Sequence, residues 1–234
     1  PPKATLAVEL VEPKLPPRAT IFALHGIRDH KESLRHWAEH LSEAGYRAVL
    51  VDSRGHGHST GDWLTYGVQE SRDLSQLVDA LGIDGPIGVM GISYGAATAV
   101  EWAARDPRVR AAVAVAPFAS LREIVPLYTP RMLPLFGWLV PRFLQMRIVD
   151  AAGRFAGFDP DLASPRAAAH ATKTPILLIH GRDDVAVPFE QSERIQGGAP
   201  SVSLIVLDDQ DHERISGDPR LWPLALDFFA RVFK

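Results

Sequence analysis

The sequence predicts an α/β fold, in which a mostly parallel central sheet carries helices on both faces. Apolar runs alternate with helical patterns along the chain, in a repeated strand–helix–strand order. Several runs are continuous stretches of Val, Ile, Leu and Ala, which is typical of parallel strands buried on both faces. The length of 234 residues suits one large domain of this kind, or one domain with a small insertion.

Seven apolar runs are predicted to be the strands of this sheet. They cover residues 5–11, 19–24, 47–52, 86–90, 109–116, 175–179 and 201–207. Each run is bounded by turn-forming or polar residues, as the ends of strands usually are.

Helical patterns fill the gaps between these strands. The first is predicted to begin at Ser33 as an N-cap and to end before Gly45. A second apolar stripe lies within 74–81, and residues 96–105 are small and apolar enough to pack tightly on a sheet. The last helix is predicted to open at Asp218, followed by a proline that suits a first helical turn. Its predicted core face consists of Leu224, Phe228, Phe229 and Val232.

Residues 119–173 interrupt the alternation, because they contain no strand pattern. They are apolar, aromatic and cut by prolines, and a connection of this length usually has a function. We interpret them as a helical lid (cap) inserted between two core segments, 1–118 and 174–234. An extra core layer or an oligomer interface is the alternative interpretation.

Composition and charge exclude several classes of protein. The net charge is −3 with no block of like charge, so nucleic-acid binding has no electrostatic support. The absence of cysteine excludes disulfides, thiolate metal sites and a cysteine nucleophile. The longest uncharged stretch of the apolar middle region, 132–141, is too short to span a bilayer. We expect a cytoplasmic location, although a chain that begins at Pro1 leaves room for a removed N-terminal signal or anchor.

A serine lies between two glycines where a predicted strand ends. Residues 87–99 read IGVMGISYGAATA, which places Ser93 between Gly91 and Gly95, after an apolar run and before a helical one. A nucleophile held in a sharp strand-to-helix turn needs this setting, because residues without Cβ let backbone and helix approach closely. A plain glycine turn with a buried serine is the alternative.

A serine hydroxyl becomes a good nucleophile only beside a base that an acid orients. His212 follows the last predicted strand and precedes the last helix, where the base belongs in the chain order Ser, Asp, His. Two candidate acids, Asp183 and Asp184, follow the strand at 175–179, and their local sequence does not separate them. A loop histidine and turn-forming aspartates are the alternatives.

Five ordered motifs resemble those of the α/β-hydrolase fold: LHGIRDHKES, LVDSRGHGHSTG, GISYG, HGRDDVAVP and DQDH. The resemblance covers most of the chain and is closest to small esterase and lipase members and the related prolyl-oligopeptidase-like hydrolases. It implies Asp184 as the acid and the backbone N–H groups of Ile27 and Tyr94 as the oxyanion hole. It implies no metal and no cofactor.

The function predicted from these residues is a serine hydrolase that cleaves carboxylic esters with short to medium acyl chains through Ser93, His212 and Asp184. A small-molecule ester is the expected partner, and the oligomeric state is not predicted. A thioesterase or small peptidase with the same triad is one alternative, and a non-catalytic scaffold that binds a ligand or partner is another. Lid residues expected to line an acyl pocket are Leu127, Met132, Phe136, Trp138 and Phe143.

Overall fold

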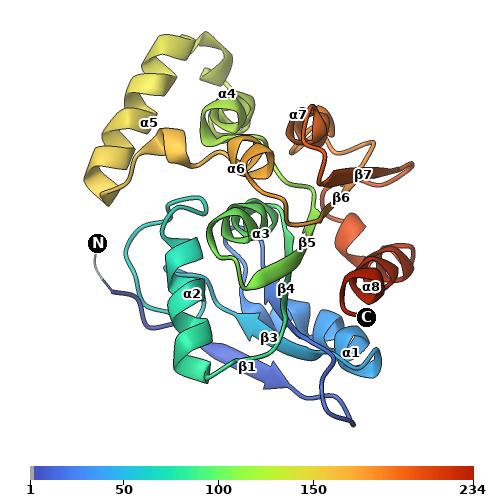
Figure 1. The fold of residues 1–234 in the computed structure, drawn as a ribbon. Helices are drawn as coiled ribbons and strands as arrows, with labels where there is room; N and C mark the ends of the chain where they lie inside the picture. The colour runs from blue at the N-terminus through green and yellow to red at the C-terminus, as the bar shows by residue number, and fades with distance from the viewer. Residues whose placement is uncertain (1–2) are drawn as a thin grey trace.

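A computed structural model describes residues 3–234 and contains one seven-stranded sheet (Figure 1). The strand order is β1-β3-β2-β4-β5-β6-β7, in which β1 pairs antiparallel with β3 and every other pairing is parallel. The strands are β1 (Val8–Val11), β2 (Thr20–Leu24), β3 (Arg47–Val51), β4 (Ile87–Ile92), β5 (Val109–Val115), β6 (Ile176–Gly181) and β7 (Val202–Leu207). The mostly parallel α/β sheet predicted from the sequence is therefore confirmed.

The first strand is shorter than the predicted 5–11. The backbone N–H of Thr5 donates to the Thr60 hydroxyl and that of Ala7 to the Ser59 hydroxyl, each at 2.8 Å. Thr5 and Ala7 thus bond to the loop at residues 59–60, and the strand register with β3 begins at Val8.

Helices cover both faces of the sheet (Figure 1). On one face α1 (Arg35–Glu43) and α8 (Leu221–Val232) bury Trp37, Leu41 and Phe229 against the strands. On the other face lie α2 (Glu70–Leu81), α3 (Tyr94–Arg105) and α7 (Glu190–Gln196). The small side chains of α3 let this helix pack closely on the central strands, as its composition predicts.

Two helix starts differ from the sequence-based expectation. A 3-10 turn, η1 (Lys31–Leu34), precedes α1. The Ser33 hydroxyl lies 2.8 Å from both the Asp29 carboxylate and the His30 carbonyl oxygen, two acceptors for its single proton, and it does not cap the helix. The last helix starts at Leu221 because Asp218 closes a turn onto the backbone N–H of Arg220. The buried face of this helix consists of Leu221, Trp222, Ala225, Phe228 and Phe229, whereas the predicted Leu224 and Val232 are only partly buried.

The segment between β5 and β6 is helical. It contains α4 (Leu121–Met132), the 3-10 turn η2 (Gly137–Leu139), α5 (Arg142–Ala156), the turn η3 (Pro160–Leu162) and α6 (Pro165–Ala171). Figure 1 shows α4 and α5 projecting from the body of the molecule, whereas α6 packs against α3 and α7. We propose that α4 and α5 form the lid of the 119–173 insertion and that α6 returns the chain to the core segment from 174. The other core segment, 1–118, begins at Pro1 and Pro2, which lie outside the described residues.

None of the helices formed by residues 3–234 combines the length and the apolar character that a bilayer crossing demands.

Candidate active site

Ser93 occupies a strained turn between β4 and α3. Its backbone has φ 54° and ψ −113°, a left-handed region that non-glycine residues rarely adopt. A Cβ on Gly91 would lie 2.3 Å from the carbonyl oxygen of Gly95, and one on Gly95 would lie 2.3 Å from that of Leu24. The two glycines are therefore required by close backbone approach, and the turn presents the serine above the sheet.

The loops after β6 and β7 bring two further predicted residues to Ser93. His212 Nε2 lies 3.0 Å from the Ser93 Oγ, and His212 Nδ1 lies 2.6 Å from Asp184 Oδ2. Because the carboxylate only accepts, Nδ1 carries the proton and Nε2 is free to accept from the hydroxyl. The neighbouring Asp183 is exposed, so the geometry selects Asp184 as the partner of His212.

Asp184 is buried and remains ionised. Burial alone would raise the pKa of Asp184, but hydrogen bonds from His180, His212 and the Val187 backbone N–H lower it to about 2. The carboxylate therefore keeps its charge across the neutral range and favours a positive charge that develops on His212.

His180 is a positioning residue that the sequence reasoning missed. Its Nε2 lies 2.7 Å from the Val187 carbonyl oxygen and 3.3 Å from Asp184 Oδ2, and both are acceptors. Its Nδ1 lies 2.6 Å from the Ser192 hydroxyl, which can donate to it. The sequence did contain a signal for this residue, since His180 directly precedes the glycine that ends β6 and leads into the loop of Asp184.

Ile27 and Tyr94, the two residues expected to supply the oxyanion hole, both line the cavity that contains Ser93. Tyr94 is the first residue of α3, a position whose amide has no partner within the helix and where the helix dipole favours an anion. Ile27 lines the same cavity from the loop after β2. The oxyanion-hole role of these two amides remains a prediction that their place in the cavity lining supports.

Buried side chains form hydrogen bonds next to these two residues. His25 donates from Nδ1 to the Gly26 carbonyl oxygen at 2.7 Å and accepts at Nε2 from the Ser53 N–H at 3.1 Å. Burial lowers the pKa of His25, which keeps this ring neutral. The Tyr94 hydroxyl donates to the buried Glu70 carboxylate at 2.8 Å.

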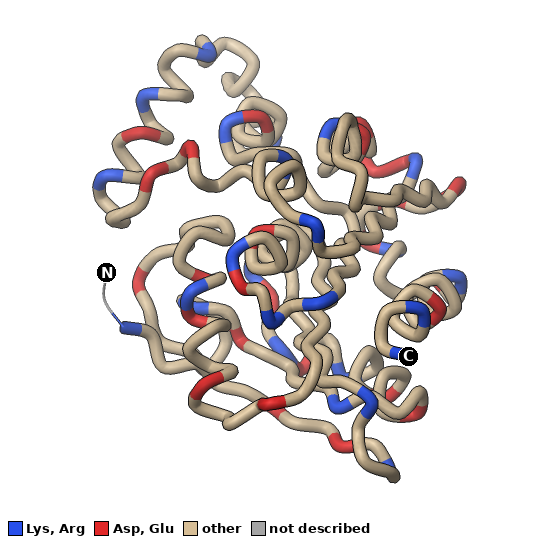
Figure 2. Tube along the Cα trace, in the orientation of Figure 1, with Lys and Arg blue, Asp and Glu red and all other residues tan. Residues whose placement is uncertain are grey.

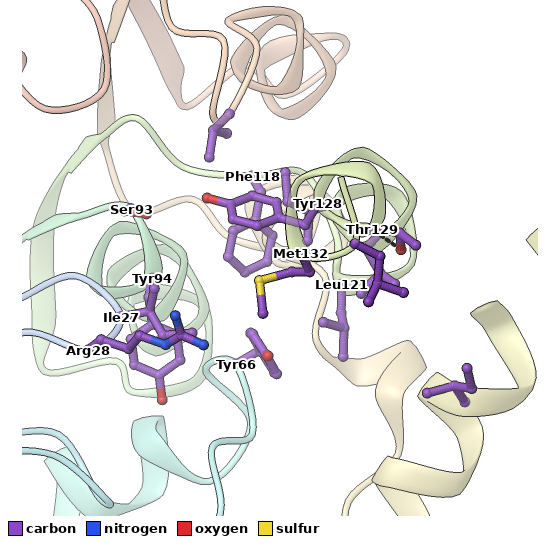
Figure 3. Close-up of a pocket in the computed structure, with 15 residues that line it drawn as sticks. Ile27, Arg28, Tyr66, Ser93, Tyr94, Phe118, Leu121, Tyr128, Thr129 and Met132 are labelled. Carbon is purple, nitrogen blue, oxygen red and sulfur yellow. Dashed lines mark hydrogen bonds between the residues drawn. The ribbon is translucent and has the colours of Figure 1, made fainter. Parts of the chain in front are cut away.

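A cavity of about 430 Å³ opens over Ser93 (Figure 3). Figure 3 shows Ile27, Arg28 and Ser93 on one side of it and side chains of α4 on the other. The α4 side chains that line it recur every three or four residues and are Leu121, Ile124, Val125, Tyr128, Thr129 and Met132. Tyr66, Phe118, Leu133, Ile148 and Val187 complete an almost entirely apolar wall.

Four of the five lid residues that were expected to line the acyl pocket lie outside the cavity lining. Met132 lines the cavity, whereas Leu127, Phe136, Trp138 and Phe143 are 41%, 66%, 71% and 68% exposed. Leu127 lies off the cavity-facing stripe of α4, and the others belong to η2, its preceding residue and the first turn of α5.

Arg28 is the only charged residue among those that line the cavity, and it was not predicted. It follows Ile27 in the oxyanion loop, and its backbone adopts a positive φ of 61°. Within residues 3–234, no group of three His, Asp or Glu side chains is placed to hold a metal ion.

Comparisons with known proteins agree with this architecture. A family model described as Hydrolase_4, serine aminopeptidase, S33, matches residues 15–155. The protein YqkD of Bacillus subtilis is 29% identical over 186 residues, which are 75% of this chain and 58% of that protein. Lipase LipV of Mycobacterium tuberculosis is 32% identical over 165 residues, which are 67% of this chain and 59% of that protein. The chain thus spans somewhat under two thirds of the length of these two relatives.

Among solved structures, the esterase Pf2001 of Pyrococcus furiosus superposes with a TM-score of 0.74 at 25% identity. The match covers 99% of this chain and 87% of that one. The α/β-hydrolase fold expected from the five motifs is therefore confirmed.

Proposed function

The chain belongs to the serine aminopeptidase S33 family of α/β-hydrolases, and on that premise we propose that it is a serine hydrolase of carboxylic esters with short to medium acyl chains. The observation that carries the proposal is the hydrogen-bonded series from Ser93 through His212 to Asp184, with distances of 3.0 and 2.6 Å, at the wall of an apolar cavity. This arrangement matches the three roles that nucleophilic ester cleavage requires.

In the proposed reaction His212 Nε2 takes the hydroxyl proton of Ser93 while the oxygen attacks the ester carbonyl. The amides of Ile27 and Tyr94 donate to the oxyanion, whose charge appears only in the transition state. Asp184 stabilises the imidazolium, which then gives its proton to the leaving alcohol. A water molecule repeats the sequence on the acyl-enzyme and releases the acid.

The cavity favours an ester over the substrate suggested by the family's name. An aminopeptidase must accommodate the positive α-amino group of a peptide, and a carboxylate is its natural partner. The residues that line this cavity include no Asp or Glu, and the one charge among them is the cation of Arg28. The apolar remainder suits the hydrocarbon of an acyl chain.

Labelling with a fluorophosphonate tests the activated serine directly. We expect the wild-type protein to be labelled and Ser93→Ala to remain unlabelled while keeping its thermal unfolding midpoint. Folded wild-type protein that does not react would overturn the proposal in favour of a non-catalytic scaffold. Matched ester, thioester and amide substrates of equal chain length then rank the leaving groups, and faster turnover of the amide would contradict the ester assignment.

A further inference from the structure

The outer surface of α4, η2 and α5 is apolar and faces water. Nine hydrophobic side chains between Met132 and Ile148 are 42% to 75% exposed, including Leu135, Phe136 and Trp138. We call this surface the arm patch. So many exposed large apolar side chains within 17 consecutive residues are uncommon on a soluble protein, and exposed apolar patches often mark an interaction site. None of the other helices described carries so many exposed large apolar residues.

The arm patch also concentrates positive charge. Residues 131–148 include Arg131, Arg142 and Arg147 and no acidic residue, so they carry +3 within a chain whose net charge is −3. The remainder of the chain therefore carries −6. Arginines recur along α5 (Figure 2).

Two of these three charges, those of Arg142 and Arg147, are not neutralised by the part of the protein that the structure describes, whereas Arg131 donates to the Val185 carbonyl oxygen. Arg142 and Arg147 are exposed, and neither forms an ion pair with any carboxylate of residues 3–234. Asp150, the acidic residue nearest in sequence on α5, is held by Arg122 at 2.7 Å. The surface thus combines exposed aromatic and aliphatic side chains with two cations, Arg142 and Arg147, that form no ion pair within residues 3–234.

We propose that the arm patch docks on an anionic lipid surface, with Phe136 and Trp138 entering the interface and Arg142 and Arg147 contacting the headgroups. Aromatic side chains favour the boundary between water and hydrocarbon, and arginine can extend its guanidinium toward headgroups from an apolar site. Helices that combine an apolar face with basic residues bind membranes in this way. The patch projects on an arm instead of lining a groove, which suits a broad surface as its partner (Figure 1).

The arm patch is continuous with the cavity above Ser93. Met132, Leu133 and Ile148 are exposed on the arm and also line the cavity. An amphiphile dissolved in a lipid surface could therefore pass its chain into the cavity without crossing water. The docking itself does not depend on the proposed esterase activity, because it uses residues outside the triad.

Vesicle flotation of the Ser93→Ala protein separates docking from turnover. We expect the protein to float with vesicles containing phosphatidylglycerol, to remain in solution with pure phosphatidylcholine, and to be released by salt. Phe136→Ser with Trp138→Ser should abolish flotation. Arg142→Gln with Arg147→Gln should weaken it by roughly fivefold for each cation removed.

Matched changes elsewhere provide the controls. Leu15→Ser removes an exposed leucine far from the arm in sequence, and Arg72→Gln removes an exposed arginine of α2; both should float like the parent. Circular dichroism and thermal unfolding verify that each variant is folded. The proposal is overturned if folded parent protein does not bind the anionic vesicles, or if the arm variants float as well as it does. The proposal is also overturned if vesicles bind no protein and sedimentation shows a dimer that is lost in the Phe136→Ser, Trp138→Ser variant. That result would mean that a second copy of the chain covers the patch.

Discussion

Asp184 and Asp183 are adjacent carboxylates with different surroundings. Asp184 is buried and accepts from His212 at 2.6 Å and from the Val187 N–H at 2.7 Å, whereas Asp183 is exposed. We predict that Asp184→Asn lowers kcat by about 10³- to 10⁴-fold on an ester substrate, because an amide there no longer enforces the Nδ1–H tautomer of His212. Steady-state kinetics of the purified variant provide the measurement.

The neighbouring residue provides a matched control for that change. Asp183→Asn removes the same charge one position away, and we expect kcat to stay within about twofold of wild type, as for a surface substitution. Equal losses of kcat in the two variants would show that kcat depends on the negative charge of the loop and not on the hydrogen bond from Asp184 to His212.

Single site residues could be predicted from the sequence where a local pattern requires them. The glycines around Ser93 and the loop position of His212 follow from chain order and turn chemistry. His180 and Arg28 were missed, because their roles depend on which loops meet above the sheet. The contact of His180 Nε2 with the Val187 carbonyl joins residues seven positions apart across a turn that no periodicity describes.

At the scale of elements, the strands were easier to predict than the helical faces. A buried parallel strand is apolar on both sides, so its identity does not depend on phase. The α4 helix carries apolar residues almost all round, so the sequence indicates that an insertion exists but not which stripe faces the cavity. That ambiguity explains why Leu127 was assigned to the pocket while Val125 was not.

The two faces of α4 predict that the same substitution changes acyl-chain selectivity on the cavity face and leaves it unchanged on the exposed face. Val125 lines the cavity, so Val125→Trp should shorten the acyl chain that fits. We expect KM for an octanoyl ester to rise by on the order of tenfold, while KM for an acetyl ester changes little. Initial rates across a series of chain lengths measure this shift.

Leu127 tests whether the shift belongs to the cavity face. It lies on the same helix but is 41% exposed and outside the cavity lining, so Leu127→Trp should leave the chain-length profile unchanged. If the two tryptophan variants show the same profile, α4 does not present the face that lines the acyl site.

Across the whole molecule, the α/β architecture followed from the order of the apolar runs, whereas the links between distant layers did not. Glu101 of α3 is one such link. Its buried carboxylate accepts from the Ser164 N–H at 2.6 Å, just before α6, and pairs with Arg105 one turn along α3. The sequence shows a glutamate within an apolar helix but gives no indication of these partners.

Burial raises the pKa of Glu101 to about 7, although Arg105 and the Ser164 N–H favour the charged form. An unfolded glutamate loses its proton near 4.5, so between these values the folded state binds more protons than the unfolded state. The free energy of unfolding should therefore fall as pH rises from 4.5 to about 7, by at most about 1.4 kcal/mol per pH unit from this group. Glu101→Gln cannot titrate, so urea unfolding across this range should give a flatter dependence on pH. Glu190→Gln changes an exposed residue of α7, so its unfolding free energy should vary with pH as that of the wild type does. If Glu101→Gln and the wild type show equal slopes of unfolding free energy against pH, the slope arises from other groups and the assignment to Glu101 is contradicted.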